Sequence, residues 1–158
     1  LDAPDDDPIR HWQEQAVQGD AEAQYQLGKI HDRSNRVPCA AAQAIQWWEK
    51  ASALGNADAQ NILALRYDMG FHLTPHYPRD ECRAIALREQ AAAQGHPEAQ
   101  TWLAQTYMYD QPHCNLVANR DKARALLEQA IANGGENTRK QAERVLYALE
   151  HNGRYPSP

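Results

Sequence analysis

Apolar side chains recur along this chain at spacings of three and four residues, in segments separated by glycine, proline or polar turns. Such spacing places them on one face of an α-helix, whereas the strict alternation of a half-buried strand is absent. Alanine and glutamine abound, and both favour helix. The chain is therefore predicted to be all-α. The predicted helices span residues 8–18, 21–32, 40–54, 57–69, 79–94, 97–109, 121–133 and 136–150.

The same helical pattern returns after turn glycines at a regular interval. Gly19, Gly55, Gly95 and Gly134 lie 36, 40 and 39 residues apart. Three of them precede nearly identical helix openings: Ala21-Glu22-Ala23-Gln24, Ala57-Asp58-Ala59-Gln60 and Pro97-Glu98-Ala99-Gln100. A period of this length is typical of stacked helical hairpins. We expect about four hairpins in one domain over residues 8–152, between an acidic lead (1–7) and a tail (153–158).

Three tryptophans fall on this repeat frame. Trp12 and Trp48 occupy equivalent positions, each three residues after an isoleucine, and Trp47 precedes Trp48. Their register predicts packing between helices, in preference to an aromatic box for a ligand. The last predicted helix keeps an apolar stripe but lacks the Ala-x-Ala-Gln opening, as expected of a helix that caps an array.

Composition and net charge limit the kinds of partner that this chain is expected to bind. The chain has 158 residues, 42% of them hydrophobic, and a formal net charge of −5. Net negative charge argues against nucleic acid as a partner, because phosphates require clustered lysine and arginine. The sequence contains no apolar run of about 18 residues, so no membrane span is predicted.

The cellular compartment is predicted from two signs. The chain begins at Leu1 rather than at methionine, which suggests that an export signal has been removed. Its three cysteines fit either an exported protein with one disulfide or a cytoplasmic protein with free thiols. Because all three lie near predicted loops, we expect an exported, periplasmic protein, with the cytoplasm as the alternative.

The repeated residues resemble those of a known family. The pattern Ala-x-Ala-Gln-x-x-Leu-Gly-x-x-Tyr, followed by Ala-x-x-Trp-x-x-Lys-Ala and a glycine, is similar to the Sel1-like repeat, a relative of the tetratricopeptide repeat. His31 stands at the tyrosine position, and Ala64 and Ala104 stand at the glycine position. The resemblance implies a right-handed α–α superhelix, a solenoid whose concave face is formed mainly by the Ala-x-Ala-Gln helices.

Removing the core stripe from those helices leaves the candidates for a partner-binding concave face. They are Tyr25, Lys29, Ile62, Leu65, Arg66, Asp68, Trp102, Gln105 and Met108. Leu65 and Trp102 suggest a contact surface, since both are apolar at positions expected to face solvent. The alternative is that both pack against a neighbouring helix. Phe71, His72 and Tyr77, in a longer connection, are further candidate contacts.

Cysteines and histidines gather in loops expected on one edge of the solenoid: Cys39, His72, His76, Cys82, His113 and Cys114. We expect two of these cysteines to form a disulfide between neighbouring repeats, either Cys82–Cys114 or Cys39–Cys82. Zinc is disfavoured because the sequence has no Cys-x-x-Cys pair. The adjacent His113 and Cys114 need not face each other, so they are weak candidates for a base and a nucleophile. No catalytic residue, metal or cofactor is therefore assigned.

The resemblance implies a non-enzymatic role in protein binding. Its sharpest form is an envelope or periplasmic immunity protein that binds one partner, a secreted antibacterial effector such as a phospholipase. The alternative within binding is a scaffold or adaptor for envelope or signalling complexes, which would have several weaker partners. The alternative from another class is a small hydrolase or metal protein that uses the cysteine and histidine edge.

Overall fold

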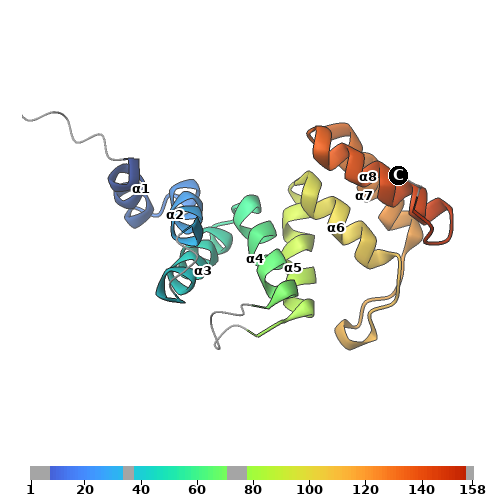
Figure 1. Cartoon of the computed structure of the whole chain (residues 1–158), viewed down its shortest axis with the longest axis horizontal. Helices are drawn as coiled ribbons and strands as arrows, with labels where there is room; N and C mark the ends of the chain where they lie inside the picture. Colours follow the sequence, from blue (N-terminus) through green and yellow to red (C-terminus); the bar gives the residue numbers. More distant parts are fainter. Residues whose placement is uncertain (1–7, 34–37, 71–77, 156–158) are drawn as a thin grey trace, which may run out of the picture. The chain divides into compact units, whose positions relative to one another are not determined.

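The computed structural model describes residues 8–33, 38–70 and 78–155, and these residues form a succession of α-helices (Figure 1). Every helix expected from the sequence is present, with ends that differ by no more than two residues from the expected ones. In chain order the elements are α1 (Pro8–Val17), α2 (Ala21–Arg33), α3 (Pro38–Ala53), α4 (Ala57–Met69), α5 (Glu81–Ala93), α6 (Pro97–Tyr107), the short 3₁₀ helix η1 (Pro112–Cys114), α7 (Arg120–Asn133) and α8 (Glu136–Glu150).

Contacts between residues divide the chain into two compact units, Leu1–Arg79 (unit 1) and Asp80–Pro158 (unit 2). In unit 1, α2 packs against both α1 and α3, and α3 packs against α4. In unit 2, α6 packs against α5, α7 and α8, and α7 also packs against α8. Each unit therefore buries apolar surface between helices that are near neighbours in the sequence, as a helical repeat requires.

Three of the four turn glycines adopt a conformation that only glycine takes easily. Gly19, Gly55 and Gly95 have φ angles of 92°, 89° and 84°. The residue after each glycine caps the next helix by accepting a hydrogen bond from a backbone N–H at its start. These caps are Asp20 to Ala23 N (2.7 Å), Asn56 to Ala59 N (2.8 Å) and His96 to Ala99 N (3.2 Å). The fourth turn differs, because Gly134 has a φ of −79°.

The glutamine of the Ala-x-Ala-Gln opening is a structural residue. Gln24, Gln60 and Gln100 are 5%, 3% and 1% exposed. Each donates its side-chain amide to a backbone carbonyl eight residues earlier, in the preceding helix. The acceptors are the oxygens of Ala16 (3.0 Å), Ser52 (3.4 Å) and Ala92 (3.3 Å). The recurring glutamine thus fastens each helix to the one before the glycine turn.

The core of unit 1 is built around tryptophan. Trp48 is 1% exposed, and its indole Nε1 donates to the backbone oxygen of Tyr25 at 3.3 Å. Gly28 on α2 makes room for this ring, since a Cβ atom there would lie 2.2 Å from the Nε1 of Trp48. Trp12 and Trp47 are half-buried against the cluster of Ala16, Ala23 and Leu27. The tryptophans therefore pack between helices, as their repeat register predicts.

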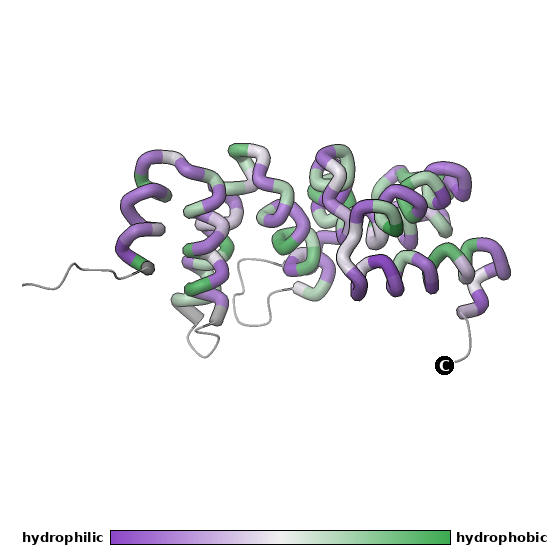
Figure 2. The backbone as a smooth tube through the Cα atoms, turned by 90° about the horizontal axis from the view of Figure 1, so that it is seen from above, coloured by the Kyte–Doolittle hydropathy of each residue, from purple (hydrophilic) through white to green (hydrophobic). Residues whose placement is uncertain are grey.

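The core of unit 2 contains aliphatic residues from all four α-helices. Its largest buried members are Ile85, Leu103, Leu127, Val145 and Leu149, each no more than 5% exposed. Figure 2 shows that hydrophilic residues dominate the first half of α8, whereas hydrophobic positions increase toward its C-terminal half. This helix therefore buries one stripe against α6 and α7 and exposes a polar face.

Candidate functional site

In unit 1, the candidate residues of α2 lie at a partly covered surface. Tyr25 and Lys29 are both half-buried. The ammonium nitrogen of Lys29 lies 5.2 Å from the centroid of the Tyr25 ring, within the range of a cation–π contact. This pair is one turn apart on α2 and leaves part of each side chain accessible to a partner.

Arg66 of α4 is used to hold unit 1 together. Its Nη2 lies 2.5 Å from the Oδ2 of Asp32 on α2, and both side chains are 25% exposed. Its guanidinium also lies 5.7 Å from the centroid of the buried Trp48 ring. The neighbouring Leu65 is 37% exposed, whereas Ile62 is half-buried. Among the α4 candidates, Leu65 thus offers the most accessible apolar surface.

Asp68 completes the α4 candidates. Its side chain is half-buried, and it already makes an interaction within the chain. A partner that contacts Asp68 would therefore bind a carboxylate that already interacts within the chain, rather than an isolated charge.

In unit 2, Trp102 of α6 is the most prominent exposed candidate. It is 38% exposed, and the guanidinium of Arg88 on α5 lies 5.1 Å from its ring centroid. Arg88 itself is only 4% exposed. The buried arginine therefore supports one part of the indole, while the rest stays accessible to solvent.

The expectation that Met108 contacts a partner is wrong. Its side chain is only 8% exposed. Met108 follows the buried Ala104 by four residues, and its backbone N–H continues the last turn of α6 by bonding to the Gln105 and Thr106 oxygens. Residues four apart share a helix face, so this side chain turns into the core. Gln105, in contrast, is half-buried and reaches the surface.

Three candidate contacts, Phe71, His72 and Tyr77, lie outside the described residues, as does His76. The side chain of Cys39 also falls outside the described part. Of the two cysteine pairings that the sequence leaves open, the structure contains Cys82–Cys114, with an S–S distance of 2.06 Å. This bond ties the start of α5 to η1, in the connection that leads to α7.

The disulfide determines whether Cys82, Cys114 and His113 can bind a metal or act in catalysis. His113 lies close to both sulfurs, but each sulfur is bonded to the other and is neither a thiolate ligand nor a nucleophile. The His113 Nε2 lies 3.0 Å from the Oε2 of Glu81, so the ring is paired with a carboxylate instead. The cluster therefore forms a structural link between α5 and the connection before α7.

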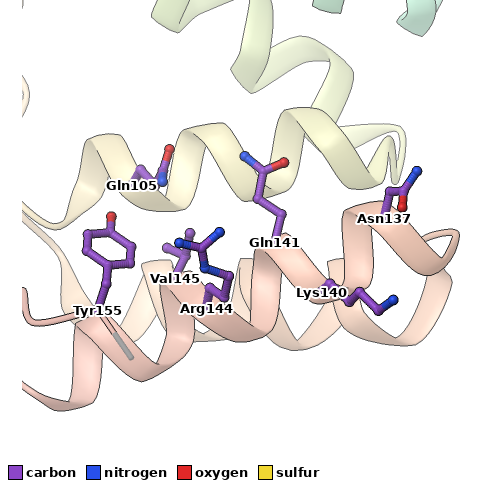
Figure 3. A pocket seen from close by; sticks show the side chains of 7 residues that line it. All are labelled: Gln105, Asn137, Lys140, Gln141, Arg144, Val145 and Tyr155. Atoms are coloured by element: carbon purple, nitrogen blue, oxygen red, sulfur yellow. The ribbon is translucent and has the colours of Figure 1, made fainter. Parts of the chain in front are cut away.

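A groove between α6 and α8 is a feature that sequence reasoning missed. It has a volume of about 370 Å³, and Figure 3 shows Gln141 reaching from α8 toward α6. The residues that line it are Gln105, Asn137, Lys140, Gln141, Arg144, Val145 and Tyr155. Only Gln105 was a candidate from the sequence. The other positions could have been found from the polar face of the last helix, which the capping interpretation left aside.

Two cations lie in this groove, and they differ in their surroundings. The Lys140 ammonium pairs with Glu136 of the preceding turn at 2.6 Å. Arg144 makes no ion pair or hydrogen bond with any of the described residues. No aspartate or glutamate lines the groove. The guanidinium of Arg144 is thus a set of hydrogen-bond donors without an acceptor inside the described chain.

A sequence model of the Sel1 repeat matches residues 21–56, 57–96 and 97–135. The chain belongs to the Sel1 repeat family. Each matched repeat begins at an Ala-x-Ala-Gln helix, and α1 and α8 fall outside the matches. The groove residues on α8 are therefore not set by the repeat pattern.

Solved structures show the same all-α solenoid fold class for this Sel1 repeat protein. A Sel1 repeat protein from Oxalobacter formigenes is similar, with 26% identity and a TM-score of 0.70, over 86% of this chain and 97% of that one. A protective antigen present in uropathogenic Escherichia coli strains, which displays an SLR fold, has 22% identity and a TM-score of 0.66. That match covers 92% of this chain and 33% of the antigen, and it shows the fold alone.

No curated protein matches the sequence. Among the described helices, none combines the length and apolar character needed to cross a bilayer. The Sel1 repeats and the exposed candidate residues fit a non-catalytic role in binding proteins.

Proposed function

We propose that this Sel1 repeat protein captures one protein partner, and that Leu65 and Trp102 are anchors of the interface. The observation that carries the proposal is the exposure of Trp102, whose indole is 38% exposed and held by the guanidinium of Arg88 at 5.1 Å. Tryptophan and arginine are enriched among the residues that dominate binding energy. A fixed, accessible indole costs little conformational entropy when a partner covers it.

The partner that we propose is a secreted antibacterial effector, such as a phospholipase, which the protein neutralises as an exported immunity protein. Two observations support this version. The Cys82–Cys114 disulfide fits an oxidising compartment such as the periplasm. The Sel1 family membership fits a partner-binding role without a cofactor. A scaffold for envelope or signalling complexes is the alternative, and it predicts several weak partners in place of one tight partner.

The first test is capture of the partner by the full chain in its native host, followed by identification of the bound proteins by mass spectrometry. An immunity protein should retain one effector in a one-to-one complex and inhibit its activity when the two are mixed. Cell fractionation should recover the protein from the periplasm with its Cys82–Cys114 disulfide formed. Several partners at substoichiometric amounts, or a cytoplasmic protein with reduced cysteines, would contradict this version.

The second test places the interface. Trp102→Ser and Leu65→Ser should each weaken the captured complex by about 2 kcal/mol or more, as truncated anchor residues do. Circular dichroism should show unchanged helicity, because both side chains are exposed at the surface. Val17→Ser and Val117→Ser are matched controls, since these valines are 81% and 75% exposed and lie on α1 and in the connection before α7 rather than on α4 or α6. Equal losses in the control variants would exclude the anchor role.

A further inference from the structure

The groove between α6 and α8 has the features of a site for an extended chain. We propose that it binds an acidic, extended segment of the protein partner, and that Arg144 pairs with an aspartate or glutamate side chain of that segment. The inference rests on the proposed function, because it specifies the chemistry of the partner at one surface of unit 2. Three observations carry it: the dimensions of the groove, its charge and its amide groups.

The dimensions suit a short stretch of extended peptide. Asn137, Gln141 and Arg144 lie on the same face of α8 and point toward α6 (Figure 3). At 1.5 Å per residue, the seven steps from Asn137 to Arg144 correspond to about 10 Å along the helix axis. An extended strand rises about 3.3 Å per residue, so this length matches about three residues of a bound segment.

The charge of the groove selects an acidic segment. Arg144 has no partner within the described residues, no carboxylate lines the groove, and the whole chain carries a net charge of −5. The groove is thus a cationic spot on an acidic protein. A guanidinium binds a carboxylate through two parallel N–H···O bonds, which is stronger and more directional than a contact with an ammonium group.

The amide groups favour a peptide over a simple anion. Gln105 stands on the α6 wall, and Asn137 and Gln141 stand on the α8 wall. Each primary amide offers donors and an acceptor, as the backbone of an extended peptide does. The Tyr155 hydroxyl adds a further polar group. A site for a free anion would need donors alone, so the acceptors on both walls point to a backbone.

The direct test is an NMR titration of the ¹⁵N-labelled full chain with an acetylated and amidated peptide, Gly-Glu-Val-Glu-Gly. We expect shifts at the side-chain amides of Gln105, Asn137 and Gln141 and at backbone amides of α8. The neutral peptide Gly-Gln-Val-Gln-Gly, with the same end groups, should bind at least about tenfold more weakly, as expected for loss of a charge-assisted pair. Equal binding of both peptides, no binding of the acidic one, or shifts confined to other helices would overturn the proposal.

Two substitutions on α8 separate a specific pair from a general charge effect. Arg144→Gln and Lys140→Gln each remove one positive charge from the groove. The Arg144 variant should bind the acidic peptide at least about tenfold more weakly, whereas the Lys140 variant should lose no more than about threefold, because its ammonium is already paired with Glu136. Equal losses in the two variants would overturn the role of Arg144. Circular dichroism of each variant checks that α8 remains folded.

Other sources of the carboxylate give different outcomes. Inorganic phosphate or acetate that produced the same shifts at the same concentration would show an anion site and overturn the peptide proposal. A neutral peptide with a free C-terminus that bound as tightly as the capped acidic peptide would show recognition of a chain end, which also overturns it.

The captured partner distinguishes failure of this inference from failure of the proposed function. If the partner binds but Arg144→Gln leaves its affinity unchanged and the acidic peptide gives no shifts, the groove inference fails and the proposed function stands. If the acidic peptide binds through Arg144 but no partner protein is captured, the groove is real and the proposed function fails.

Discussion

Unit 1 and unit 2 stabilise equivalent pairs of helices by different means. In unit 1, the Trp48 indole of α3 packs against α2, where Gly28 leaves the space that the ring fills. In unit 2, the equivalent positions on α6 and α7 are occupied by Ala104 and Leu127, which are both fully buried. The repeat register thus matches glycine with tryptophan in unit 1 and alanine with leucine in unit 2. Unit 2 also has the Cys82–Cys114 disulfide.

The two units also differ in what they leave at the surface. Arg66 in unit 1 is neutralised by Asp32, whereas Arg144 in unit 2 has no partner among the described residues. Trp48 is 1% exposed in unit 1, and Trp102 is 38% exposed in unit 2. Trp48 and Arg66 thus serve the structure of unit 1 itself. The comparison teaches that unit 2 presents the residues best suited to a partner.

Removal of the disulfide should have the largest effect on stability. Cys82 and Cys114 are 32 residues apart, and a bond that closes a loop of this size stabilises a chain by about 3–4 kcal/mol. Cys82→Ser with Cys114→Ser should therefore lower the free energy of unfolding of unit 2 by about that amount. Urea unfolding followed by NMR reports each unit separately. An equal loss of stability in unit 1 would contradict the assignment of this bond to unit 2 alone.

Gly28→Ala should produce the largest effect within unit 1. The added Cβ would lie 2.2 Å from the Nε1 of Trp48, so the indole or the α2 backbone must move. Overpacking of this kind costs about 1–3 kcal/mol, and we expect the upper end because the obstacle is a rigid ring. Urea unfolding of the variant measures the loss.

Two controls show whether the clash causes that loss. Ala104→Gly, at the equivalent position of unit 2, should cost about 1 kcal/mol, which is the ordinary penalty for glycine in a helix. Trp48→Leu should be destabilising alone but should remove most of the cost of Gly28→Ala, since the smaller leucine, which occupies the equivalent position in unit 2, removes the ring that the added Cβ would meet. Additive losses in the double variant would show that Gly28 and Trp48 are not coupled.

The sequence predicted the helices well because the same residues that repeat also determine the helix ends. Gly19, Gly55 and Gly95 require positive φ, and the polar residue after each caps the next helix. Gly134 repeats in the sequence but has a φ of −79°, and Gly135 after it has no side chain to cap α8. The 3₁₀ helix Pro112–Cys114 was not predicted, since a loop of this length contains too few residues to show a period.

The candidate site was less predictable than the fold. Leu65 and Trp102 are exposed, as the repeat frame suggests, but Met108 is buried because the last turn of α6 extends its inner face by one more residue. Arg144 was missed because α8 lies outside the repeats, so no comparison between repeats could identify its unusual positions. A partnerless arginine is visible only when the neighbouring carboxylates have been placed in space.

The contrast between Arg66 and Arg144 predicts a difference in stability between two variants, smaller than the effects of the disulfide and of Gly28→Ala. Asp32→Asn removes the carboxylate that lies 2.5 Å from the Arg66 guanidinium, and this partly exposed pair should contribute about 1 kcal/mol. Arg144→Gln should change the free energy of unfolding by less than about 0.5 kcal/mol, because no described group loses a partner. Thermal unfolding of both variants makes the comparison. A larger loss in the Arg144 variant would show that this side chain has a structural role.

The last prediction concerns a pH-dependent contribution from a tyrosine that recurs in the two units. The Tyr107 hydroxyl donates to the Glu89 Oε1 at 2.6 Å, and the Tyr67 hydroxyl donates to the Glu49 Oε1 at 3.2 Å. Burial and the hydrogen bond to Glu89 raise the pKa of Tyr107 above its usual value of 10.0, against an opposing contribution from Lys122. The native state therefore holds this proton more tightly than the unfolded state does.

A raised tyrosine pKa stabilises the native state below about pH 10, and the contribution is lost as the pH rises through the folded-state pKa. Tyr107→Phe should cost about 1 kcal/mol near neutral pH, since it removes the hydrogen bond to Glu89. The difference in unfolding free energy between the native chain and this variant should then shrink above about pH 10. Urea unfolding at pH 8, 9, 10 and 11 measures the difference, and other groups that titrate in this range cancel between the two chains. A difference that stayed constant to pH 11 would contradict the raised pKa, because the tyrosine would then lose its proton equally in both states.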